Sequence, residues 1–154
     1  MDAVKAAGGV VSAGLAVTGA LHAVWAVTPW PLRTPEEFVD TVVGAGEGPP
    51  PPSACLVVAG LLGTASYLVA AEAGLLPAAG PRGLRRAGLQ RAGVRTAAGV
   101  LLARGLTGPV VFGRLSERSA RFRRLNLRYY SPLCVALGAG AAAVGWRGSS
   151  ATDC

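Results

Sequence analysis

The sequence predicts an all-α fold, and specifically an integral membrane four-helix bundle. Of its 154 residues, 51% are hydrophobic and 15% are charged, whereas a soluble domain usually carries about 25% charged residues. Four apolar runs approach the length of about 20 residues that a membrane-spanning helix needs. We therefore expect a single membrane domain over residues 1–154. The expected spans are residues 6–27, 53–71, 94–113 and 131–146, joined by loops at residues 28–52, 72–93 and 114–130.

The first run, residues 6–27, contains no charged residue. A cleaved signal peptide is the alternative, because Val24-Trp25-Ala26 resembles a cleavage site. The run is longer than the apolar core of a signal peptide, which spans about 7–15 residues, so we favour an uncleaved span. Small residues spaced by four allow another helix to approach this one closely; they are Ser12, Ala16 and Ala20.

The loop after this span is acidic and contains the start of a short helix. Thr34 precedes Pro35-Glu36-Glu37, and threonine followed by proline is typical of a helix cap and first turn. The second run, residues 53–71, has small residues at Ala59 and Gly63.

The third run, residues 94–113, carries Arg104 near its middle. A central arginine costs about 2.5–3.5 kcal/mol on insertion, which the surrounding aliphatic residues offset. Pro109 is expected to break or bend this helix. The fourth run follows Arg128-Tyr129-Tyr130-Ser131-Pro132, in which arginine and tyrosine suit the headgroup layer and proline the first helical turn.

The distribution of arginines sets the expected orientation. Cytoplasmic loops are usually basic, so the second loop is placed in the cytoplasm, together with both termini, and the acidic first loop outside the cytoplasmic membrane. The third loop is then outside although it is the most basic. Either residues 94–113 do not cross, or the two outer loops pair by charge. We favour the second, which joins Arg121 and Arg124 to Glu36, Glu37 and Asp40.

Three motifs resemble those of a known family. They are His-Ala-Val-Trp at 22–25, Arg-Gly-Leu-Thr-Gly at 104–108 and Tyr-Tyr-Ser-Pro-Leu-Cys at 129–134. The chain resembles the actinobacterial membrane proteins grouped as domain of unknown function 3995 over nearly its whole length. That resemblance implies four spans and no assigned activity. The family often has glycines after the tryptophan and an acidic residue where Asn126 stands.

Four residues form a candidate polar pocket. His22 and Trp25 are three apart and share a helix face, while an arginine inside a membrane usually faces the bundle interior or a cavity. His22 either handles a proton or ligand or, as we favour, bonds a neighbouring helix. Arg104 either binds an anionic or quinone-like headgroup or lies along its own helix. Tyr130 completes the set.

Cys55 and Cys134 are expected at similar depth near the outer ends of two spans. A disulfide is allowed in an oxidising exterior, although two unpaired thiols are favoured. The sequence contains no CxxC motif and one histidine. No metal site or cofactor is therefore predicted. No nucleic-acid partner is predicted either, because the arginines flank apolar runs and fit anionic lipid headgroups better.

The predicted function is non-enzymatic. We expect a bundle that binds membrane lipids, another membrane protein or a second copy of itself. The alternative is a small membrane enzyme or carrier that acts on an amphipathic or anionic substrate through His22 and Arg104. The sequence has no nucleotide-binding loop and no paired nucleophile and base to favour that alternative.

Overall fold

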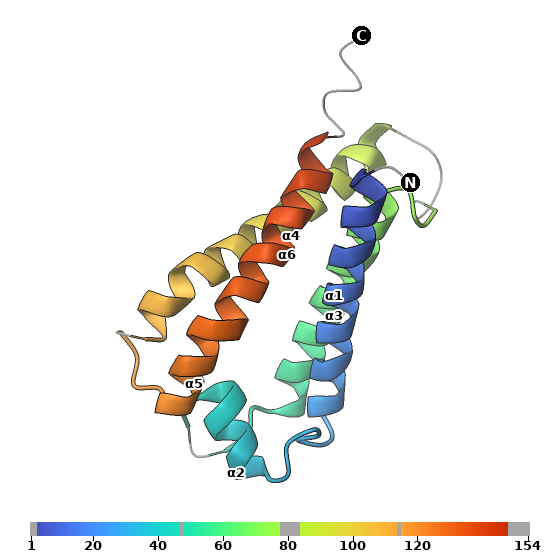
Figure 1. Cartoon of the computed structure of the whole chain (residues 1–154). Helices are drawn as coiled ribbons and strands as arrows, with labels where there is room; N and C mark the ends of the chain where they lie inside the picture. The colour runs from blue at the N-terminus through green and yellow to red at the C-terminus, as the bar shows by residue number, and fades with distance from the viewer. Residues whose placement is uncertain (1–2, 47, 78–83, 114, 148–154) are drawn as a thin grey trace.

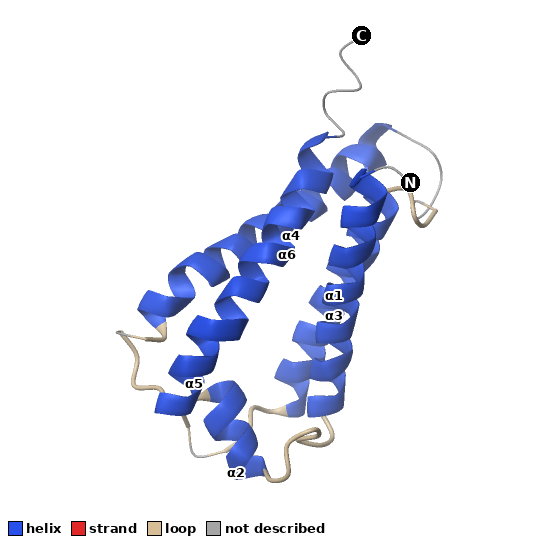
Figure 2. Ribbon diagram, viewed as in Figure 1, coloured by secondary structure: helices blue, strands red, loops and turns tan. Residues whose placement is uncertain are grey.

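The computed structural model describes residues 3–46, 48–77, 84–113 and 115–147, except for the side chains of 84–87 and 147. Within these ranges every regular element is helical (Figure 2), which confirms the all-α class. Part of the predicted second loop, residues 78–83, lies outside the described residues. The long helices are α1 (Ala3–Trp25), α3 (Pro52–Glu72), α4 (Leu84–Val111) and α6 (Ser131–Arg147).

Shorter helices lie between the long ones. They are α2 (Pro35–Phe38), which continues into the π-helical segment η1 (Val39–Val43), and α5 (Ala120–Leu125), which continues through the π-helical segment η2 (Asn126–Tyr130) into α6. The predicted loop 114–130 is therefore largely helical. The arginine-rich sequence suggested a loop. The Ser119 hydroxyl instead caps the first turn of α5 by accepting from the Phe122 N–H at 3.0 Å.

The helix boundaries follow local chemistry. The Thr34 hydroxyl accepts from the Glu37 N–H at 3.1 Å and Pro35 occupies the first turn, as the sequence predicted. The predicted third span begins ten residues after the start of α4 (94 − 84). The α4 helix runs through Pro109 without a break, so the predicted break is wrong. Proline lies in its last turn, and the helix ends at Val111.

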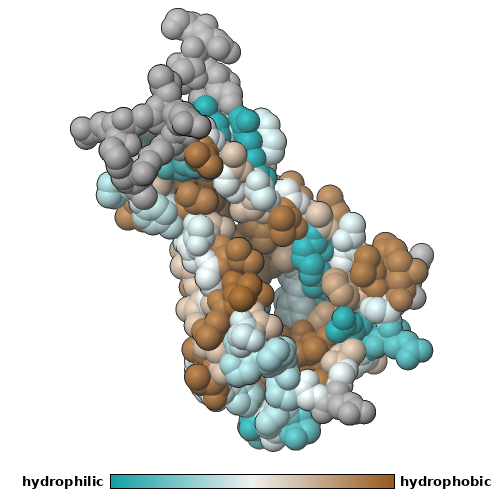
Figure 3. Space-filling model, turned by 180° about the vertical axis from the view of Figure 1, so that it is seen from behind, coloured by the Kyte–Doolittle hydropathy of each residue, from teal (hydrophilic) through white to brown (hydrophobic). Residues whose placement is uncertain are grey.

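The long helices pack as two pairs, α1 with α3 and α4 with α6 (Figure 1). The pairs meet near the end where α1 begins and α6 ends, and they spread apart toward the other end, where α2 and α5 lie. Seen from behind, the molecule is hollowed between the pairs (Figure 3). The first and third predicted loops thus share one end of the molecule.

The core is built mostly from small or branched residues. It contains Val11, Leu15, Val69, Val94, Ala98, Leu137 and Ala141. Many other large apolar side chains are exposed: Val10 is 73% exposed, Leu61 66% and Leu106 67%. Brown and pale surface covers much of the sides of the helices in Figure 3, and strongly hydrophilic surface lies toward the two ends and in a strip at mid-height.

Two described helices are long and apolar enough to cross a membrane, α1 and α3. The α6 helix has 17 residues, and α4 includes several arginines along its length. Length and composition therefore support a membrane location weakly, through two helices.

A glycine in α6 sets the distance to α4. A Cβ at Gly138 would lie 3.0 Å from the Leu102 backbone nitrogen, whereas a Cβ at Gly99 meets nothing within 4 Å. We expect Gly138→Ala to destabilise the fold by about 1–3 kcal/mol, because the α4 backbone must move. Gly99→Ala should be neutral or stabilising by up to about 1 kcal/mol. Thermal unfolding followed by circular dichroism measures both, and equal melting temperatures would contradict this packing.

Candidate functional site: an end cap and a partly buried arginine

The end of the molecule away from the termini is closed by two segments that we call the end cap, residues 35–44 and 118–130. The first includes α2 and η1 and the second includes α5 and η2. They belong to the two predicted outer loops and lie side by side in the structure. Backbone carbonyls, rather than ion pairs, provide most of the polar contacts between them.

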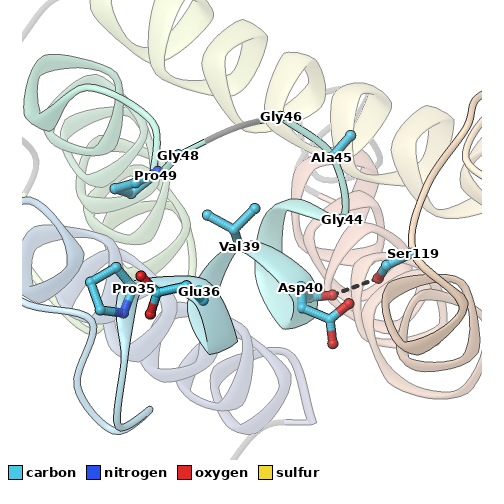
Figure 4. Close-up of a pocket in the computed structure, with 10 residues that line it drawn as sticks. All are labelled: Pro35, Glu36, Val39, Asp40, Gly44, Ala45, Gly46, Gly48, Pro49 and Ser119. Atoms are coloured by element: carbon cyan, nitrogen blue, oxygen red, sulfur yellow. Dashed lines mark hydrogen bonds between the residues drawn. The ribbon is translucent and has the colours of Figure 1, made fainter.

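The carbonyl groups at the end of η1 need partners from elsewhere, because the last four carbonyls of a helix have no intrahelical donor. The chain leaves η1 through Gly44, whose φ of 77° is left-handed. Donors then come from the second segment. They are the Ser119 hydroxyl to the Asp40 carbonyl (2.7 Å; Figure 4), the Tyr130 hydroxyl to the Thr41 carbonyl (3.1 Å), the Arg118 guanidinium to the Val43 carbonyl (2.6 Å) and the Ser119 N–H to the Gly44 carbonyl (2.7 Å).

An aromatic cluster fills the space beneath these bonds. Phe122 is 5% exposed, and its ring centre lies 6.0 Å from the rings of both Phe112 and Tyr130. Gly44 lies against Phe122 so closely that a Cβ there would come 2.5 Å from a ring carbon. Gly44 is thus required both by its backbone conformation and by the aromatic ring.

Tyr130 links this cluster to the cap carbonyls. Burial raises the pKa of its phenol, and the positive charge of Arg121 offsets part of that rise. The hydroxyl therefore stays protonated at neutral pH and can donate to the Thr41 carbonyl.

The predicted pocket residues His22 and Trp25 lie on α1, in contact with the first cap segment. Their ring centres are 4.9 Å apart, and Trp25 packs edge-on against Phe38 at 5.2 Å. The His22 Nδ1 lies 2.9 Å from the Thr18 carbonyl of its own helix. One ring nitrogen of His22 is thus occupied within α1.

Arg104 lies on α4 and turns toward α6 and η2. Its Nη2 donates to Asn126 Oδ1 at 2.9 Å, and its guanidinium carbon lies 4.5 Å from the centre of the Phe112 ring. Nη1 is buried and has no hydrogen-bond partner. Asn126 is 1% exposed, and the Ser131 hydroxyl approaches its Oδ1 at 3.4 Å.

The four predicted pocket residues therefore fall into two groups. His22 and Trp25 contact each other, and Arg104 and Tyr130 both reach the Phe112–Phe122 cluster. No contact recorded among the described residues joins His22 to Arg104. The sequence did not predict Asn126 as the partner of Arg104, because the burial of Asn126 comes from the packing of η2 against α4. It did not predict the role of Ser119 either, although a serine at the cap position before a helix was an available signal.

The predicted charge pairing of the outer loops reduces to one ion pair in the described part of the chain. Arg121 and Glu37 lie 3.4 Å apart with both side chains partly exposed, so the pair contributes at most about 1 kcal/mol. Arg124, Glu36 and Asp40 form no ion pair there. The pKa of Glu36 is lowered by its own backbone N–H and by the Thr34 hydroxyl. A second pair, Arg91 with Glu72 at 3.1 Å, joins α4 to α3 near the other end.

The remaining predictions concern cysteines and metals. Cys55 and Cys134 are free thiols in the structure, so the disulfide that the sequence allowed is not present. The described residues contain no cluster of three or more histidine, cysteine, aspartate or glutamate side chains that could hold a metal. A pocket of about 340 Å³ lies between α2, η1 and the glycine-rich turn after them, and Glu36, Val39 and Asp40 line it (Figure 4).

The fold and the site define an all-helical protein whose spread helix pairs are joined by an end cap beside a partly buried arginine. The chain belongs to the family described as protein of unknown function DUF3995, whose profile matches residues 15–141. The matched range includes the end cap and Arg104, and it confirms the family suggested by the sequence motifs. No curated protein and no solved structure matches the chain.

Two serines close together in the chain test the end cap. Ser119→Ala removes the donor to the Asp40 carbonyl and the cap of α5, and we expect a loss of about 1–3 kcal/mol. Ser116→Ala is the control, because the Ser116 hydroxyl is buried without a partner and its removal should cost nothing. Hydrogen exchange of the amides in residues 35–44 should accelerate in the first variant alone. Equal exchange in both would show that the cap does not depend on Ser119.

Proposed function

We propose that this protein is an integral membrane four-helix bundle that binds a lipid or a protein partner and performs no chemistry. The observation that carries the proposal is that many large apolar side chains are exposed while glycines pack closely between the helices. Large apolar side chains face outward on the long helices, among them Val17, Leu56 and Val100. Closely packed glycines such as Gly138 and Gly140 lie between helices. Lipid-exposed bundles have this distribution, because small residues let helices approach and lipid solvates the large ones.

The α4 and α6 helices, which do not have the length and composition of a typical membrane span, also fit a membrane bundle. The α6 helix continues without interruption from α5 and η2, so its apolar run is extended toward the interface. The polar side chain of Arg104 on α4 turns inward to Asn126. An inward-facing arginine supports insertion, because the cost of a membrane arginine falls when it is bonded inside the bundle.

The orientation that we propose places the end cap outside the cytoplasmic membrane and both termini in the cytoplasm. The basic residues within 72–93, a stretch that includes the start of α4, then lie in the cytoplasm, where basic residues beside membrane spans are usually found. The basic residues of the outer segment 118–130 are used within the cap: Arg118 bonds the Val43 carbonyl and Arg121 pairs with Glu37. Their engagement offsets the unfavourable placement of a basic segment outside.

A binding role is favoured over an enzyme or carrier role. An enzyme built on His22 and Arg104 needs both groups at one substrate, and the recorded contacts place them in separate groups. His22 Nδ1 is occupied by the Thr18 carbonyl. The sequence and the described residues offer no nucleophile with an adjacent base.

Cysteine labelling tests the proposed topology. After replacement of the native cysteines by alanine, single cysteines are placed at Val27, Leu115 and Leu75, which are exposed. We expect an impermeant thiol reagent to label the Val27→Cys and Leu115→Cys proteins in intact cells, and the Leu75→Cys protein after lysis alone. These sites disturb no cap bond, whereas a cysteine at Ser119 would.

Two results would contradict the topology. Labelling of Val27→Cys without Leu115→Cys would place the two cap segments on opposite sides and exclude a crossing α4. Labelling of all three in intact cells would exclude a spanning bundle. Release of the wild-type chain from membranes by alkaline carbonate would refute the membrane location itself.

A further inference from the structure

We propose that Arg104 binds the anionic headgroup of a membrane lipid within the bundle, just beneath the end cap. The inference rests on the proposed membrane location and goes beyond it by naming the site and the ligand class. The ligand is a phosphate or carboxylate group attached to an apolar tail. Asn126 holds the guanidinium in position for it, and the Ser131 hydroxyl donates to the same Asn126 oxygen.

The first argument is charge. Within the described part of the chain the recorded ion pairs are Arg91 with Glu72 and Arg121 with Glu37, and neither includes Arg104. The polar partner of Arg104 is the neutral amide of Asn126. An arginine stays protonated even in a protein interior, and a buried unpaired charge is costly. An anion from outside the chain would supply the missing negative charge.

The second argument is the excess of hydrogen-bond donors. A guanidinium has five N–H groups, and Nη1 is buried without an acceptor. The amide oxygen of Asn126 already receives Nη2 at 2.9 Å and faces the Ser131 hydroxyl at 3.4 Å. The oxyanions of phosphate and carboxylate are acceptors that match the planar fork of arginine. The site therefore lacks an acceptor of this kind.

The third argument is that the guanidinium is held in place before any ligand binds. Gly108 lies directly beside it, and a Cβ there would overlap Nη1 and lie 2.8 Å from the Ser131 hydroxyl oxygen. Phe112 lies 4.5 Å from the guanidinium carbon. A preorganised side chain loses less conformational entropy when it binds a ligand.

The fourth argument selects a lipid as the source of the anion. Arg104 is seven residues before the end of α4 (111 − 104), which is about 10 Å along a helix. That depth is within reach of a lipid headgroup drawn toward a long arginine side chain. Apolar side chains four residues before and seven residues after Arg104 lie near its own face of α4 and are exposed, with Val100 at 63% and Val111 at 39%. They offer an acyl chain a surface that free phosphate does not need.

Native mass spectrometry of the full chain tests the proposal. The protein is purified in a neutral detergent and offered phosphatidylglycerol and phosphatidylcholine with the same acyl chains. We expect wild type to retain phosphatidylglycerol with a preference of about tenfold, which corresponds to about 1.4 kcal/mol. Arg104→Gln should lose the preference. Asn126→Asp should lose it while remaining folded, because the new carboxylate supplies the counter-charge from within.

Arg128→Gln is the matched control. It removes an exposed arginine from η2 and should keep the tenfold preference. Absence of a preference in wild type would overturn the proposal without any variant, and so would an equal loss in Arg128→Gln and Asn126→Asp, since that result indicates general surface attraction. Inorganic phosphate is the second ligand: if it raises the melting temperature of wild type but not of Arg104→Gln, and the lipid does not, the lipid source is wrong.

A failure of this inference is separable from a failure of the proposed function. Alkaline carbonate extraction is carried out on wild type and Arg104→Gln in parallel. If both remain in the membrane and neither prefers the anionic lipid, the membrane bundle stands and the Arg104 site is refuted. If wild type is extracted, the membrane location fails first.

Discussion

The unmet backbone carbonyls at the end of η1 are the constraint on which this structure depends. The η1 segment ends at Val43, and its last carbonyl groups need donors from elsewhere. Those donors come from residues 118–130. Their placement brings Phe122 against Gly44 and sets where α6 begins, since Tyr130 immediately precedes Ser131. The two helix pairs, which meet near the termini, are thereby also joined at their spread end.

The segment η2 serves the end cap and the arginine site at the same time. Its last residue, Tyr130, donates to the Thr41 carbonyl, while its first, Asn126, accepts from Arg104. A π-helical segment contains an extra residue relative to an α-helix, and such segments often occur at functional sites. In η2 the wider turn lets two residues four positions apart contact different partners, one in the cap and one on α4.

The sequence predicted the fold class well because that class depends on local patterns, namely apolar runs, the Thr34–Pro35 helix start and the Ser131–Pro132 first turn. It also predicted that the two outer segments would meet. The predicted reason was charge pairing, whereas the observed contacts are mostly hydrogen bonds to backbone carbonyls. Such acceptors cannot be recognised from side-chain charges. Asn126 was not predicted as a partner of Arg104, since only tertiary packing buries it. His22 and Arg104 were grouped because both are polar residues in predicted spans, and this says nothing about the direction in which the two helices present them.

The end cap also constrains the order in which the chain can assemble. Its bonds join residues separated by 75, 79 and 89 positions. At a synthesis rate of about 5–20 residues per second, the donors to the η1 carbonyls are synthesised about 4–18 seconds after those carbonyls. The α1–α3 pair is synthesised before α6 exists. Closure of the cap is thus a late event that follows translation of the second pair, and a chain truncated before Ser119 would expose the end of η1 permanently.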